Sequence, residues 1–260
     1  MMTSIRRFIP LLAAVTLLGA IAPVVRAQVP STATWRANAE SAYRQGEKQF
    51  DLGNYEQAVQ HYTDAINADP DRARAYIGRG FALYRLGNPR KALEDYSRAI
   101  ELDPDSTEAY IGRGVVAYVL GQKNRSLADY TEAIRLSPNL AAAYLGRGRV
   151  YGELQEYRRA VQDYNQAIRL DNTLSEAYAN RGLARWYLKD RRGAREDYDR
   201  ALKLDPENAN AYAGRASVRY AQGDRRGAIA DLKAARKIYA ERGDRDTSET
   251  IEKVIEQLQG

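Results

Sequence analysis

Two sets of opposite charges recur along this chain with one spacing, and they define the chemistry that its side chains could perform. Arginines stand 34 residues apart, and each is followed 16 residues later by an aspartate. The arginines are Arg79, Arg113, Arg147, Arg181 and Arg215, and the aspartates are Asp95, Asp129, Asp163, Asp197 and Asp231. Guanidinium and carboxylate groups form bidentate ion pairs, whereas unpaired arginines would bind the phosphates or carboxylates of a ligand.

The two sets change together near the amino end, and this favours pairing. Gln45 and His61 stand where the first arginine and the first aspartate would be. We therefore predict that each arginine pairs with an aspartate of the same or an adjacent repeat. An arginine ladder that binds anionic ligands is the alternative.

Little else in the sequence could catalyse a reaction. The chain has no cysteine, so thiol chemistry is excluded, and its one histidine, His61, has no nucleophile, base or metal-ligand set beside it. The run Gly78-Arg79-Gly80 follows no predicted strand and lacks the third glycine of a nucleotide-binding loop. We expect no enzyme activity, no cofactor and no metal.

Glycoside hydrolysis is the enzymatic alternative, and it would need two carboxylates that face each other. The candidates are Glu47, Asp51 and Glu153, which lie in distant repeats.

The 34-residue period covers residues 39–242 and predicts pairs of helices. The units are 39–72, 73–106, 107–140, 141–174, 175–208 and 209–242, with positions counted from 1 to 34 in each. Small residues recur at positions 8, 20 and 27 and tyrosines at positions 4 and 24, so both runs follow a helical face. A break near position 15, usually glycine, separates the runs and predicts two antiparallel helices joined by a tight turn.

This pattern resembles the tetratricopeptide repeat family. The family's small residue at position 8, alanines at 20 and 27, aromatic at 24 and proline at 32 recur in nearly every unit, although Tyr replaces Trp at position 4 and Arg replaces Leu at position 7. The resemblance implies an all-α, right-handed solenoid of six helix-turn-helix repeats. It also implies a non-catalytic scaffold that binds proteins.

In that family the first helix of each repeat lines a concave groove, and the equivalent residues here are mostly apolar. The implied groove residues are Tyr43, Phe50, Ile77, Phe81, Tyr84, Ile111, Val115, Tyr118, Leu145, Leu183, Trp186, Tyr187 and Tyr220. Aromatic anchors in a groove are typical of peptide recognition, so we expect a peptide or protein partner there. The alternative is that many of these side chains pack against neighbouring helices. The carboxylate clamp found in part of the family is absent.

The amino end of the chain predicts export from the cytoplasm, and the carboxyl end predicts a helix that caps the stack of repeats. Residues 1–27 combine Arg6 and Arg7 with an apolar run and a terminal Ala27, as in a signal peptide, and an uncleaved anchor is the alternative. Either way we expect the repeats outside the bacterial cytoplasm, in the periplasm or an equivalent lumen. Residues 28–38 are expected to form a linker and the start of the first helix. Residues 243–260 are expected to form a capping helix with Asp246 at its N-cap and an apolar stripe of Ile251, Val254, Ile255 and Leu258.

Charged residues are concentrated in the turns, and we expect them to form one basic and one acidic edge of the stack, called the basic rim and the acidic rim. The formal net charge is +6, of which three belong to residues 1–27, so we expect no nucleic-acid partner. The turns within units are basic and those between units are acidic. The basic residues are Arg90, Lys91, Lys123, Arg125, Arg158, Arg159, Arg191, Arg192, Arg225 and Arg226. The second functional hypothesis is therefore an adaptor that docks this basic rim on an anionic membrane surface.

Overall fold

The computed structural model describes residues 32–259, which contain helices and no strand, as the repeat pattern predicts. The helices are α1 (Thr32–Asp51), α2 (Tyr55–Ala68), α3 (Ala73–Arg85), α4 (Pro89–Leu102), α5 (Thr107–Val119), α6 (Lys123–Leu136), α7 (Ala141–Glu153), α8 (Tyr157–Leu170), α9 (Ser175–Tyr187), α10 (Arg191–Leu204), α11 (Ala209–Ala221), α12 (Arg225–Glu241) and α13 (Arg245–Gln259). The predicted signal segment, 1–27, lies outside the described residues. In the described range, no helix has both the length and the apolar character needed to span a bilayer.

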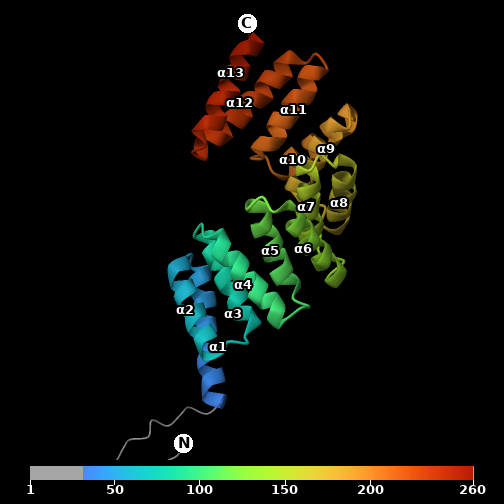
Figure 1. Cartoon of the computed structure of the whole chain (residues 1–260). Coiled ribbons are helices and arrows are strands. Elements are labelled where there is room, and N and C mark those ends of the chain that lie inside the picture. The colour runs from blue at the N-terminus through green and yellow to red at the C-terminus, as the bar shows by residue number, and fades with distance from the viewer. Residues whose placement is uncertain (1–31, 260) are drawn as a thin grey trace, which may run out of the picture.

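The helix pairs stack in chain order into a curved all-α solenoid (Figure 1). Each helix packs against the next one along the chain. From α1 to α11, odd-numbered helices of neighbouring repeats also approach one another, whereas none of the described even-numbered helices contacts another. The odd-numbered helices, which begin each repeat, therefore line the inner face of the curve.

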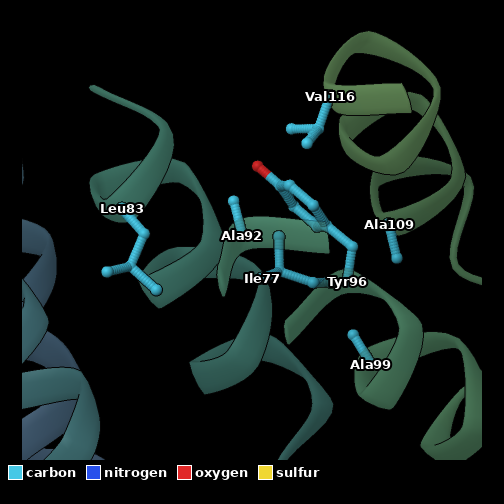
Figure 2. Packing of buried hydrophobic residues seen from close by; sticks show 7 residues of the cluster. All are labelled: Ile77, Leu83, Ala92, Tyr96, Ala99, Ala109 and Val116. Atoms are coloured by element: carbon cyan, nitrogen blue, oxygen red, sulfur yellow. The ribbon is translucent and has the colours of Figure 1, made fainter. Parts of the chain in front are cut away.

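In repeats 1, 2, 3 and 5, the tyrosine at position 24 joins neighbouring repeats by filling the space beside two glycines, one in its own repeat and one in the next. The ring of Tyr96 is buried, and Figure 2 shows it between Ile77 of α3 and Val116 of α5. A Cβ atom built on Gly80 would lie 3.1 Å from this ring, and one built on Gly112 of the next repeat only 2.4 Å from it. Only glycine leaves room for the ring at such an approach. Where position 6 is glycine, it therefore makes room for the tyrosine of the preceding repeat. The sequence predicted that this glycine leaves room for a bulky side chain or a close backbone, but did not identify the tyrosine.

The same rule explains why the last repeat differs. Its position 24 is Leu232 and its position 8 is Ala216, so the smaller side chain and the added methyl group occur together. Both residues are buried in one cluster with α13. A smaller side chain at position 24 thus accompanies a larger one at position 8 of the same repeat.

The capping helix α13 covers the end of the stack through Ile251 and Ile255, which are buried. Val254 departs from the predicted stripe, because it is 39% exposed. The N-cap is Asp244, whose carboxylate accepts a hydrogen bond from the backbone N–H of Thr247 at 3.1 Å, and Asp246 lies in the first helical turn. The prediction of Asp246 as the cap was wrong because α13 begins immediately after the turn at Gly243.

The turns at position 15 require a left-handed backbone, which four repeats supply with glycine. Repeats 4 and 5 have Gln155 and Lys189 there instead, at φ values of 61° and 67°. A side chain in this region costs about 1–2 kcal/mol, partly offset by the greater chain entropy of glycine. We expect Lys189→Gly to raise the free energy of unfolding by about 0.5–1 kcal/mol. The reverse change, Gly121→Ala, should lower it, and urea midpoints for both variants test the assignment; a loss of stability in Lys189→Gly would contradict it.

Candidate protein-binding groove

Each predicted arginine meets the predicted aspartate of its own repeat. The shortest distances between guanidinium nitrogen and carboxylate oxygen in the five pairs lie between 2.5 and 2.8 Å. In the Arg79 pair, Nε and Nη2 donate to the two oxygens of Asp95, which is a bidentate geometry. All five aspartates are buried. The arginines are therefore engaged inside the protein, and the structure leaves no arginine ladder free for an anionic ligand.

The arginines also reach the preceding repeat, which sequence reasoning missed. The remaining nitrogen, Nη1, donates to the side chain at position 25 of the repeat before. The acceptors are Thr63, Ser97, Thr131, Asn165 and Asp199. The available signal was position 25, which carries an oxygen acceptor in repeats 1 to 5. Each arginine thus ties three helices of two repeats together behind the groove.

A hollow of about 730 Å³ opens on the inner face of repeats 1 to 3. It collects residues of α1, α3 and α5 that the groove prediction named: Tyr43, Phe50, Ile77, Phe81, Tyr84, Ile111 and Val115. Most of them are half-buried, while Ile77 is only 4% exposed and forms the floor. A second hollow of about 640 Å³ shares Phe81, Glu108 and Ile111 with the first and extends to the turn of residues 137–140. The apolar surface therefore continues on both sides of Ile111.

A separate hollow of about 410 Å³ lies on repeats 3 to 6 and is more polar. It contains the predicted Tyr118, Leu183 and Tyr187 together with Arg149 and three asparagines. The ring of Tyr187 stacks on Tyr157, with centroids 4.5 Å apart. The groove is thus divided into an apolar section and a polar section.

The other predicted groove residues lie elsewhere. Leu145 and Trp186 are half-buried and pack against core clusters, as the alternative interpretation of the groove residues expected. Tyr220 is 55% exposed and lines none of these hollows.

Charged side chains surround the apolar section. Glu47 and Asp51 enter it from α1, Glu108 from α5, and Arg74 and Arg85 from α3. Burial and a hydrogen bond to Glu47 raise the pKa of the Tyr43 hydroxyl to about 12. The Tyr43 hydroxyl therefore stays neutral and donates a hydrogen bond to Glu47. Among residues 32–259, no three His, Asp or Glu side chains are grouped so that they could hold a metal ion.

The carboxylates suit binding better than glycoside hydrolysis. Glu47 and Asp51 lie on one helix and share a hollow, whereas Glu153 lines the separate polar hollow. Glu153 is also paired with Lys123 at 3.3 Å. The three candidates named for that reaction are therefore not brought together.

Comparison with known proteins agrees with this architecture. A tetratricopeptide repeat model matches residues 73–106, and a second model of the same repeat matches residues 46–87, 148–188 and 192–223. No curated protein matches the sequence.

Solved structures share the fold. MamA is 26% identical, with a TM-score of 0.59 over 66% of this chain and 94% of its own. The pilF protein of Pseudomonas aeruginosa is 18% identical, with a TM-score of 0.71 over 80% of this chain and 94% of its own. YrrB, described as a TPR protein with an unusual peptide-binding site, is 22% identical, with a TM-score of 0.57 over 74% and 97% of the two chains.

Proposed function

Since this chain belongs to the tetratricopeptide repeat family, we propose that it is a protein-interaction scaffold whose first three repeats hold an extended segment of a partner protein. The observation that carries the proposal is the apolar hollow of about 730 Å³, with aromatic rings from repeats 1 and 2 and aliphatic side chains from repeat 3 along its walls. A protein core would close such a space, and an aromatic-lined concave site is where binding energy concentrates.

The form of the site suits an extended chain. The apolar surface runs across α1, α3 and α5, and the rings of Phe50, Phe81 and Tyr96 contact one another edge to face. These contacts hold Phe81 in place before any partner arrives, which lowers the entropy cost of binding. A segment lying across the helices would place successive side chains against successive repeats.

The proposal is tested with two variants that make the same change at the same repeat position. Tyr84 and Tyr220 both stand at position 12, but only Tyr84 lines the apolar hollow. We expect Tyr84→Ala to weaken partner binding about tenfold, as loss of an aromatic anchor does, and Tyr220→Ala to bind as the wild type does.

The measurement is quantitative capture of bacterial envelope proteins on wild type and both variants, after thermal unfolding has shown that both variants fold. Partners captured equally by all three proteins would place the binding site outside this hollow and contradict the proposal.

We also propose that the scaffold works outside the cytoplasm, which rests on the signal-like sequence of residues 1–27. Cell fractionation of the full chain and of a chain lacking these residues tests it, and equal cytoplasmic retention of both would contradict it.

The local partners of the basic rim make membrane docking a weaker proposal than binding in the groove. Arg159 pairs with Glu156 at 2.7 Å, Arg192 with Glu196 at 3.4 Å, and Arg225 donates to the carbonyl of Leu258. The two glutamates offset the charges of Arg159 and Arg192, which reduces the net charge that the rim could offer to anionic headgroups.

A further inference from the structure

The apolar hollow contains three carboxylates that have no ion-pair partner among the residues that the structure describes. They belong to Glu47, Asp51 and Glu108. This differs from the polar hollow, where Glu176 lies 3.4 Å from Arg149 and Glu153 lies 3.3 Å from Lys123. All three side chains are exposed, so a cationic group of a ligand can reach them beside the apolar walls of the hollow.

The three carboxylates line one hollow from two helices, Glu47 and Asp51 from α1 and Glu108 from α5. After burial, which has the largest effect, the charges of Glu47, Asp51 and Glu108 all raise the pKa of the Tyr62 hydroxyl. Tyr62 is buried between α1 and α3, beside Gly46 and Gly78. Carboxylates from two helices of different repeats are thus near enough to influence the same side chain.

The arginines of the hollow do not neutralise this group. The guanidinium of Arg85 lies 4.5 Å from the ring centroid of Tyr55. Arg74 is exposed in the first turn of α3 and forms no ion pair with any described residue. Three carboxylates and two guanidinium groups line the hollow, so it carries an excess of negative charge next to several aromatic rings, which also attract cations.

We propose that the segment held by the apolar hollow is cationic as well as apolar, with a lysine or arginine side chain bound among Glu47, Asp51 and Glu108. This inference rests on the proposed function. The cation meets carboxylates and ring faces together, while apolar residues of the same segment pack on Phe81 and Ile111. Because these two residues line both apolar hollows, apolar side chains can be accommodated on either side of the cation.

A selection from a random library of displayed twelve-residue peptides tests this even while the natural partner is unidentified. The targets are the wild type, the double variant Glu47→Gln with Glu108→Gln, and the control Glu94→Gln. Glu94 is exposed on α4, which lies on the other side of the repeat, and its replacement removes charge without touching the hollow.

We expect wild type and Glu94→Gln to enrich peptides with lysine or arginine beside apolar residues. The double variant should bind these peptides about tenfold more weakly in fluorescence anisotropy. It should bind analogues with glutamine in place of the cation as the wild type does.

The other outcomes overturn the inference in distinguishable ways. Enrichment of apolar peptides without a basic preference, or of acidic peptides, would refute the cation site and leave the peptide-binding function standing. Absence of any enriched peptide from the wild-type selection would refute both.

Discussion

Arg113→Ala is expected to lower the free energy of unfolding by about 3 kcal/mol, and to cost more than Asp129→Ala. The reason is an asymmetry in burial, because the Asp129 side chain is 3% exposed and that of Arg113 is 20% exposed. Removing the arginine leaves a buried carboxylate without its countercharge. Removing the aspartate leaves a cation that still reaches solvent and the hydroxyl of Ser97.

The coupling energy between Arg113 and Asp129 is measured with a double-mutant cycle of urea unfolding. Hydrogen exchange shows which helices lose stability. We expect the double variant to be more stable than the sum of the single effects predicts, by at least about 1 kcal/mol. Amides of α4 should lose protection together with those of α5 and α6, because Arg113 joins the two repeats. Simple additivity would contradict the coupling. The exposed pair Arg98 and Glu101 serves as the control, and its cycle should show no measurable coupling.

The sequence predicted the ion pairs because both partners keep one residue type from repeat to repeat. The third partner of each arginine could not be found in that way. In repeats 1 to 5 its position carries Thr, Ser, Asn or Asp, so only the presence of an oxygen acceptor repeats. The inter-repeat bond depends on chemical class and on the stacking of repeats, and one repeat considered alone shows neither.

The groove was predictable as a set of positions but not as a surface. Tyr84 and Tyr220 share position 12, yet Tyr84 is half-buried in a hollow and Tyr220 is exposed. The repeats on both sides of Tyr84 enclose it, whereas Tyr220 stands in the last repeat. The role of Glu108 was missed for a similar reason, because its neighbours in the hollow come from α1, two repeats earlier in the chain.

The close contact between tyrosine and glycine predicts opposite effects for one substitution at two sites. Gly112→Ala would place a Cβ atom 2.4 Å from the Tyr96 ring, which is only 1% exposed and is packed against residues of α3 and α5. We expect it to lower the free energy of unfolding by about 2 kcal/mol, because overpacking outweighs the gain in helix propensity. Gly152→Ala is the matched control, since its Cβ atom would lie 3.6 Å from the Tyr164 hydroxyl. It should raise stability by about 0.5–1 kcal/mol.

Tyr96→Leu identifies the cause of the loss. In the Gly112→Ala background, the smaller side chain should cost less than it does in the wild type, because it relieves the contact that the new methyl group creates. The last repeat already carries compensation of this kind, with Leu232 at position 24 and Ala216 at position 8. Urea unfolding of the two single variants and the double variant measures the coupling. Equal costs of Tyr96→Leu in both backgrounds would show that the glycine is required for a reason other than the ring.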